Sequence, residues 1–148
     1  MYCNGVQSYR KTNVTTSDPA RLIILCYEGA IDSLKLAKQK MKEKDYEKKE
    51  TAIINAQDII NELLCSLDFE RGGEIAINLS SLYNYMIRRI LHGDVNRDTG
   101  AIDEVIGMLN ELLSAWRELA LKTERQIQTA QDSLYCQKRA VGSGYISV

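Results

Sequence analysis

The side chains that could support chemistry in this sequence are one histidine and four cysteines. His92 is the only histidine and precedes Gly93 at a predicted helix end, where an imidazole interacts favourably with the helix dipole. A cysteine–histidine nucleophile would need a thiol brought to His92 by the fold, and no neighbouring residue orients such a pair. We therefore expect a structural role for His92 and predict no catalytic residue and no enzymatic activity.

The spacing of the ligand-type residues also argues against a metal site. A di-iron centre in a helical bundle requires Glu-x-x-His motifs, but the residue three positions before His92 is Arg89. The cysteines form no Cys-x-x-Cys pair, which is typical of reduced thiols in a reducing compartment; they are Cys3, Cys26, Cys65 and Cys136. We expect no metal and no cofactor, and a cysteine-based metal or redox protein is a minor alternative that metal analysis would test.

Two short motifs have both a binding interpretation and a structural one. Gly72-Gly73 could form a phosphate nest, but the strand and the Gly-Lys-Ser/Thr ending of a P-loop are missing. A turn between two helices is the better interpretation, because glycine adopts positive φ without steric penalty. Arg88-Arg89 could bind a phosphate or an acidic partner, but arginines near a helix end also offset the helix dipole, and we favour that role.

Composition and charge indicate a cytosolic helical protein. The chain has 148 residues, the size of one domain with a real core, and a net charge of -1, which favours neither nucleic acid nor an anionic membrane as a partner. No apolar run approaches the ~20 residues of a membrane span, and the first residues lack the apolar core of a signal peptide. The single proline, the single phenylalanine and the scarcity of alternating β-branched residues predict an all-α fold.

The first predicted helix is more apolar than a bundle helix needs to be. Asp18 and Pro19 provide an N-cap and a first helical residue, and a turn near Lys44-Asp45 ends the segment. One face is a core stripe of Ile23, Cys26, Ala30, Leu34, Ala37 and Met41. A second apolar row needs another cover; it consists of Leu22, Leu25, Gly29 and Leu36.

Three further helices complete an antiparallel up-down-up-down four-helix bundle. The second spans about Tyr46 to Leu67, with a core row of Ile53, Ala56, Ile60, Leu63 and Leu67. The third begins at Glu74 and ends near His92-Gly93, with a core row of Ile75, Leu79, Leu82, Met86 and Ile90 beside a row of Ala76, Tyr83, Ile87 and Ile90. The fourth starts at Asp98 or Thr99, and its core row is Ile102, Val105, Leu109, Leu112, Trp116 and Leu119, flanked by Ile106 and Leu113.

The two ends of the chain lie outside this bundle. Residues 1–17 are predicted to be an N-terminal cap in which only Val6 and Tyr9 can dock, and residues 18–122 contain the bundle helices. Residues 123–148 are a C-terminal extension, partly helical or mobile. The spacing of Thr123, Ile127, Ala130 and Leu134 prolongs the last helix, and Gly142 to Gly144 is predicted to break it.

The surplus apolar row of the first helix needs to be covered from water. Three covers are available: the chain's own N-terminal segment, a second copy of the chain, or an amphipathic segment of another protein. Ordinary packing within the bundle could also bury the row, and periodicity alone does not choose among these alternatives.

Three stretches of the sequence resemble the FliS family of flagellin-specific export chaperones. They are VTTSDPARLIILCYEGAI (14–31), SLDFERGGEIAINLSSLYNYMIRRIL (66–91) and IDEVIGMLNELLSAWREL (102–119). The resemblance covers about Tyr9 to Leu121 and includes a mild departure, Cys26-Tyr27-Glu28, where the family more often has Leu-Tyr-Asp. It implies a cytosolic helical bundle that binds the C-terminal segment of flagellin, prevents premature polymerisation and assists delivery to the type III export gate.

The resemblance also suggests which residues contact the client. The surplus row would belong to a groove lined by residues of three helices: Leu22, Leu25, Tyr27, Gly29, Leu36, Ile54, Ile59, Leu64, Tyr83 and Ile87. Each could instead be a core residue, and we favour the core for Tyr83 and Ile87. The N-terminal segment with Val6 and Tyr9 would act as a lid that competes for the groove, and Tyr9 would bear on docking to the export gate. The alternative function is a self-associating structural bundle, a homodimer without a flagellin client.

Overall fold

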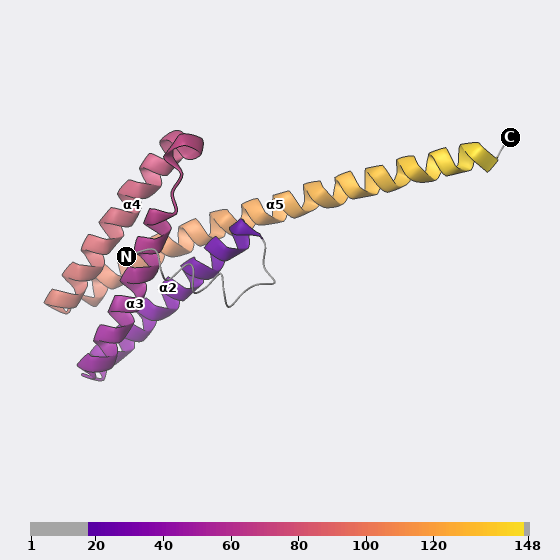
Figure 1. Cartoon of the computed structure of the whole chain (residues 1–148). Helices are drawn as coiled ribbons and strands as arrows, with labels where there is room; N and C mark the ends of the chain where they lie inside the picture. Colours follow the sequence, from indigo (N-terminus) through magenta and orange to yellow (C-terminus); the bar gives the residue numbers. More distant parts are fainter. Residues whose placement is uncertain (1–17, 147–148) are drawn as a thin grey trace.

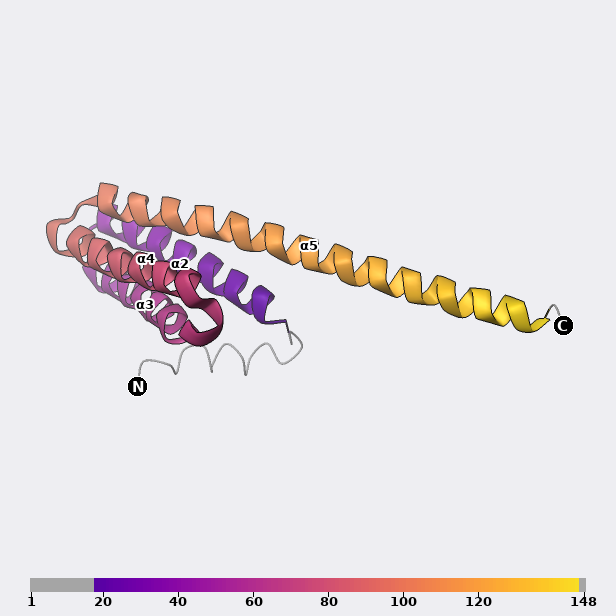
Figure 2. The same ribbon diagram turned by 90° about the horizontal axis from the view of Figure 1, so that it is seen from above.

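The structure is a computed structural model that describes residues 18–146, and these residues form four helices (Figure 1). The helices are α2 (Pro19–Lys42), α3 (Tyr46–Cys65), α4 (Phe69–Asn96) and α5 (Thr99–Ile146). Neighbours in the chain pack against each other, and α2 also packs against α5, which closes the bundle (Figures 1 and 2). The predicted all-α antiparallel bundle is confirmed. Val6 and Tyr9 of the predicted N-terminal cap lie outside the described residues.

An aspartate caps the start of each helix. The side chain of Asp18 accepts a hydrogen bond from the backbone N–H of Ala20 at 3.1 Å, and the three other caps make the same kind of contact; they are Asp45, Asp68 and Asp98. A carboxylate at this position satisfies N–H groups that have no partner within the helix and interacts favourably with the helix dipole. The starts predicted for the first, second and fourth helices are therefore confirmed.

The junction between α3 and α4 differs from the prediction in one respect. Gly73 has φ 51° and ψ -124°, a conformation that favours glycine, and it kinks α4 as the predicted turn requires. The polar residues before it were expected to form the turn, with the helix starting at Glu74. Instead, the residues from Phe69 onward form a first helical turn. The side chain of Asp68 caps this turn by accepting hydrogen bonds from the backbone N–H groups of Glu70 and Arg71.

The end of α4 shows that the prediction of a stop at His92-Gly93 was wrong. The helix continues to Asn96 and ends at Arg97, which adopts a left-handed conformation and donates its backbone N–H to the carbonyl of Gly93. Gly93 is buried, and a Cβ there would lie 2.8 Å from Cγ1 of Ile102. This glycine allows the end of α4 to approach the start of α5 closely and does not end the helix.

The core confirms most of the predicted rows. Buried residues include Cys26, Ala30, Leu34, Ala37 and Met41 of α2, Ile53, Ala56, Ile60 and Leu63 of α3, and Ile102, Val105, Ile106, Leu109 and Leu113 of α5. The row predicted for α4 is wrong at its N-terminal half, where Ile75 is 71% exposed and Leu82 is 36% exposed. In α5, Leu119 is 52% exposed, and the residues that follow from Leu121 to Ala140 are exposed as well.

The last helix extends well beyond the bundle. Helix α5 is 48 residues long, and its C-terminal half projects away from the other three helices (Figures 1 and 2). The break predicted at Gly142 to Gly144 is not present, because the helix continues to Ile146. The division into a bundle ending at residue 122 and an extension from residue 123 stays a prediction. None of the helices in residues 18–146 is long and apolar enough to cross a membrane.

Candidate binding surface

The residues first considered for chemistry do not come together in the structure. His92 is exposed, with its Nδ1 atom 3.1 Å from Nδ2 of Asn96 and its Nε2 atom 3.6 Å from a carboxylate oxygen of Asp98. Cys26 is buried in α2, whereas Cys65 and Cys136 are exposed. Within residues 18–146 no group of three or more histidine, cysteine or acidic side chains is arranged to hold a metal ion.

The arginine pair of α4 has a different role from the predicted one. The helix continues to Asn96 and has no basic residue in its last turn, so the arginines do not offset its dipole. Arg89 instead donates to Glu104 of α5 at 2.8 Å, and Tyr85 donates its hydroxyl to the same carboxylate at 2.6 Å. The bond from Tyr85 lowers the pKa of Glu104, and the same bond raises the pKa of Tyr85. These contacts join α4 to α5.

Two of the predicted groove residues form a buried pair. Tyr27 of α2 and Tyr83 of α4 are hydrogen-bonded through their hydroxyl groups, and their ring centroids are 6.5 Å apart. Tyr27 is fully buried and Tyr83 is 2% exposed. Burial raises the pKa of both hydroxyl groups, because a phenolate would lose its hydration. Tyr83 is therefore a core residue, which is the role we favoured for it. Tyr27 was predicted to line the groove, but it has no exposed surface for a client to contact.

The other eight predicted groove residues differ in exposure. Leu36 is 45% exposed and Ile54 is 48% exposed, so both offer apolar surface to a partner. The remaining six are half-buried: Leu22, Leu25, Gly29, Ile59, Leu64 and Ile87. Of these, Ile59, Leu64 and Ile87 pack against the core cluster, so a partner would reach only their outer edges.

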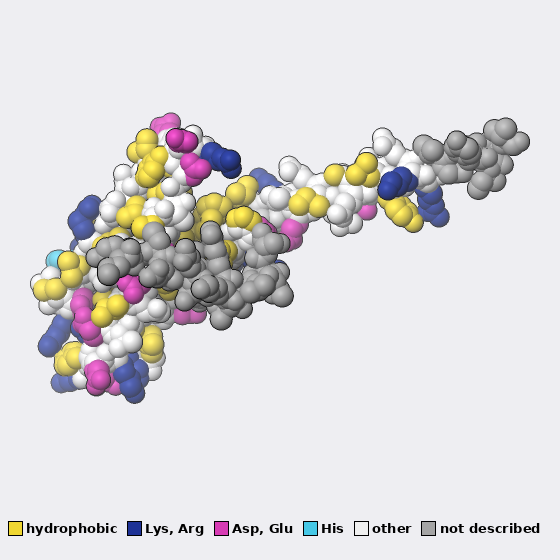
Figure 3. Space-filling model, in the orientation of Figure 1, with side chains coloured by type: hydrophobic (Ala, Val, Ile, Leu, Met, Phe, Trp, Pro, Cys, Tyr) yellow, Lys and Arg dark blue, Asp and Glu magenta, His cyan; other side chains and the backbone are white. Residues whose placement is uncertain are grey.

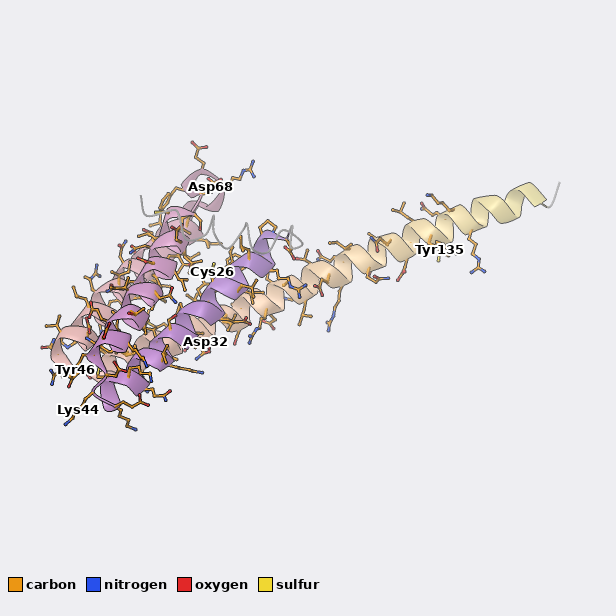
Figure 4. All side chains as sticks on the ribbon, turned by 60° about the horizontal axis from the view of Figure 1, so that its bottom comes forward. Cys26, Asp32, Lys44, Tyr46, Asp68 and Tyr135 are labelled. Atoms are coloured by element: carbon orange, nitrogen blue, oxygen red, sulfur yellow. The ribbon has the colours of Figure 1, made fainter. Side chains whose placement is uncertain are left out.

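An apolar hollow lies at the end of the bundle where α3 passes into α4. It has a volume of about 320 Å³, and its apolar lining is Ile23, Leu63, Leu67, Ile75, Ala76, Leu79, Tyr83 and Trp116. Each of the four described helices contributes side chains to the lining of the hollow. Asp68 and Arg71 also line it and are its charged residues. Figure 4 shows Asp68 at the start of α4, far from Lys44 and Tyr46 at the opposite end. Figure 3 shows hydrophobic side chains on this part of α4 and where α4 separates from α5.

Sequence periodicity placed six residues of this apolar hollow in core rows; they are Ile23, Leu63, Leu67, Ile75, Leu79 and Trp116. Only Gly72-Gly73 pointed to this place, because a kink at the start of α4 turns its first residues away from the direction of the rest of the helix. The apolar row then continues onto a part of α4 that no other described helix covers completely, as the exposure of Ile75 demonstrates.

A second hollow, between α2 and α5, is more polar. Its volume is about 480 Å³, and it is lined by Asp18, Arg21, Ile24, Leu25, Glu28, Arg117, Ala120, Leu121 and Glu124. Arg117 donates to Glu28 at 2.6 Å and so links the two helices there. Leu25 is therefore on the α5 side of α2 and borders charged residues, which suits a peptide segment with alternating apolar and polar side chains.

The comparisons with known proteins identify the family. The model of the family described as flagellar protein FliS matches residues 2–124. The chain belongs to the FliS family. The match ends within α5, so the last part of this helix lies beyond the FliS pattern.

Relatives with curated names are similar along most of their length. The flagellar secretion chaperone FliS of Salmonella typhimurium is 38% identical over 128 residues, which cover 83% of this chain and 95% of the relative. The FliS of Bacillus subtilis is 32% identical over 123 residues, covering 83% and 90%. The FliSB of Pseudomonas aeruginosa is 39% identical over 106 residues, covering 72% and 84%. All three names describe flagellar secretion chaperones.

A solved structure supports the FliS fold. The crystal structure of a flagellar chaperone from bacteria matches with a TM-score of 0.67 and covers 80% of this chain and 97% of the other. The two sequences are only 20% identical, so this likeness concerns the helical architecture.

Proposed function

We propose that this FliS-family protein is a flagellar secretion chaperone that binds the C-terminal segment of flagellin, with the apolar hollow as its main docking site. The observation that carries the proposal is the 71% exposure of Ile75 on the wall of a hollow to which every described helix contributes apolar side chains. A protein in water rarely leaves such a surface uncovered unless a partner binds there. The relatives named as flagellar secretion chaperones support the class of partner.

The chemistry of the hollow suits an amphipathic client segment. Ile75, Leu79 and Trp116 provide apolar and aromatic contact area, whereas Asp68 and Arg71 beside them can pair with charged residues of the client. A helix that places apolar residues at intervals of three and four would bury one face here and leave the other in water. Such a client face would otherwise associate with other flagellin molecules, so the complex would prevent premature polymerisation.

The proposed contact extends beyond the hollow. A disordered segment that folds on binding loses about 2 to 5 kcal/mol to ordering, so the affinity must come from a large area. Leu36 and Ile54 are exposed and could continue the contact along α2 and α3. Leu22 and Leu25 could continue it at the start of α2, where each is half-buried.

The role proposed for the N-terminal segment follows from its attachment. Helix α2 begins at Pro19, one turn before Ile23 in the apolar hollow. The residues that precede α2, including Val6 and Tyr9, are therefore tethered beside the hollow at a high effective concentration. We propose that they compete with the client for it and that Tyr9 contacts the export gate once the client has displaced the segment.

The experiment that tests this function is a titration of the full-length protein with a flagellin peptide. Isothermal titration should use the last ~40 residues of flagellin from the same organism, with circular dichroism of the mixture. We expect submicromolar binding, a negative heat-capacity change and more helix than the sum of the separate components. A peptide of the same composition in scrambled order is the control. Equal heats for the two peptides, or no binding of either, would contradict the proposed function.

A further inference from the structure

The C-terminal half of α5 continues the packing pattern of the bundle without any bundle to pack against. Every residue from Leu121 to Ala140 is exposed. The buried row of α5 nevertheless runs on at alternating spacings of three and four, through Ile102, Ile106, Leu109, Leu113, Trp116, Ala120, Thr123, Ile127, Ala130, Leu134 and Gln137. This is the 3.5-residue repeat of a coiled coil, and it keeps its phase from the core into the exposed segment.

A lone exposed helix of this length gains little stability from its own hydrogen bonds. Ile127 is 53% exposed and Leu134 is 59% exposed, and both lie on the same face. The opposite face carries the charged residues Arg125, Asp132 and Arg139, and Gln128 donates to Asp132 at 3.2 Å. The hydroxyl of Thr123 donates to the carbonyl of Leu119 at 3.0 Å, so this polar residue of the row can be buried at little expense. The segment is therefore an amphipathic helix with one face to cover.

We propose that residues 120–140 of α5 form an antiparallel two-stranded coiled coil with the same segment of a second copy of the chain. The charges that flank the apolar row decide both the partner and the direction. On one side of the row the flanking positions are Glu124, Gln131 and Lys138. When two copies align antiparallel with their centres near residue 132, Glu124 of each copy lies opposite Lys138 of the other, and the two Gln131 residues meet.

This self-complementary arrangement is what a two-fold symmetric contact requires, because each copy supplies both members of the ion pair. A parallel alignment would instead place Glu124 beside Leu119 and Lys138 beside Ser133, with no ion pair. The antiparallel alignment also sets Leu134 of one copy against Ala130 of the other. A large side chain facing a small one lets the helices approach closely.

The proposal concerns residues that lie almost entirely beyond the segment matched by the FliS family, which ends at residue 124. It is therefore independent of the apolar hollow and of the proposed client. Because only two large apolar side chains per copy enter the contact, we expect a weak dimer with a dissociation constant on the order of ten micromolar.

Sedimentation velocity of the full-length protein from about 1 to about 100 µM tests the proposal across the expected dissociation constant. Leu134→Gln should weaken the dimer at least about tenfold, because the substitution removes a buried leucine from both copies. The matched control is Tyr135→Gln, since Tyr135 is 67% exposed and lies next to Leu134 but on the outer face. A monomer at every concentration would overturn the proposal, and so would a dimer that Leu134→Gln leaves intact.

Charge variants test the direction of the two helices. Glu124→Lys alone and Lys138→Glu alone should each weaken self-association about threefold to tenfold, because like charges then face each other twice. An equimolar mixture of the two variants should regain the dimer, since both ion pairs re-form between unlike copies. Unchanged self-association of both variants would overturn the antiparallel arrangement, as would a mixture that associates no better than either variant.

Discussion

Replacing Ile75 with glutamine should weaken binding of the flagellin peptide about fivefold to thirtyfold. Complete burial of an isoleucine side chain contributes about 1.5 to 3 kcal/mol. Ile75 is 71% exposed in the unliganded protein, so about 1 to 2 kcal/mol of that contribution is available to a client that covers it. Glutamine would also bring a polar group into the contact, which acts in the same direction.

The same exposure predicts that Ile75→Gln leaves the bundle intact. Little apolar area is lost from the folded protein, and glutamine is a good helix former, so the free energy of unfolding should change by less than about 0.5 kcal/mol. Urea unfolding followed by circular dichroism measures this change. Isothermal titration with the flagellin peptide then measures the loss of affinity at constant stability.

The matched control for this experiment is Val95→Gln. Val95 is also 71% exposed and also belongs to α4, but it lies at the other end of that helix and does not line the apolar hollow. Its replacement should leave the affinity for the peptide unchanged. Wild-type affinity of Ile75→Gln, or an equal loss for both variants, would refute the assignment of the client to the hollow.

Three predictions concern stability, each measured by urea unfolding. Gly93→Ala should destabilise the protein by about 1 to 3 kcal/mol through a clash with α5. The control is Gly107→Ala, which should stabilise the protein by about 0.5 to 1 kcal/mol because a Cβ there meets nothing within 4 Å. Destabilisation by both substitutions would contradict the close approach of α4 and α5 at Gly93. Tyr27→Phe and Tyr83→Phe should each lower the free energy of unfolding by about 1 to 3 kcal/mol. The double variant should lower it by less than the sum of the two single losses. Additive losses would show that the two hydroxyl groups are not coupled. Lys49→Met should be less stable than the wild type, because a hydrogen bond to a carboxylate of α4 raises the pKa of Lys49 above its usual 10.5. The difference in free energy of unfolding between the two proteins should be complete below pH 10.5 and should shrink as the pH rises through the raised pKa of Lys49. A difference that stays constant above pH 11 would contradict this prediction.

The helices, their order and most of the buried rows could be predicted from the sequence. An aspartate before a helix and a spacing of three and four are local features, and they act within a few residues of the chain. They located the start of α2 at Asp18 and Pro19 and the buried face of α3 at Ile53, Ala56 and Ile60. The resemblance to the FliS family, carried by three stretches of sequence, is confirmed by the family match.

The candidate binding surface could be predicted only in part. Of the ten residues expected to line a groove, Tyr27 and Tyr83 are buried, and the client contacts of the others stay predictions. The apolar hollow was missed because Ile75 and Trp116 share the periodicity of core residues. Nothing in their spacing distinguishes an apolar side chain that another helix covers from one that no helix reaches.

The sequence by itself determined which side chains share a face of each helix, because a residue's direction follows from the 3.6-residue turn alone. The tertiary structure decided which parts of those faces are covered. Gly93 allows α4 and α5 to meet closely at one end of the bundle, whereas at the other end no described helix fully covers the part of α4 that follows the kink at Gly73, where Ile75 is exposed. Burial depends on where neighbouring helices lie in space, and that position results from contacts between residues distant in the chain.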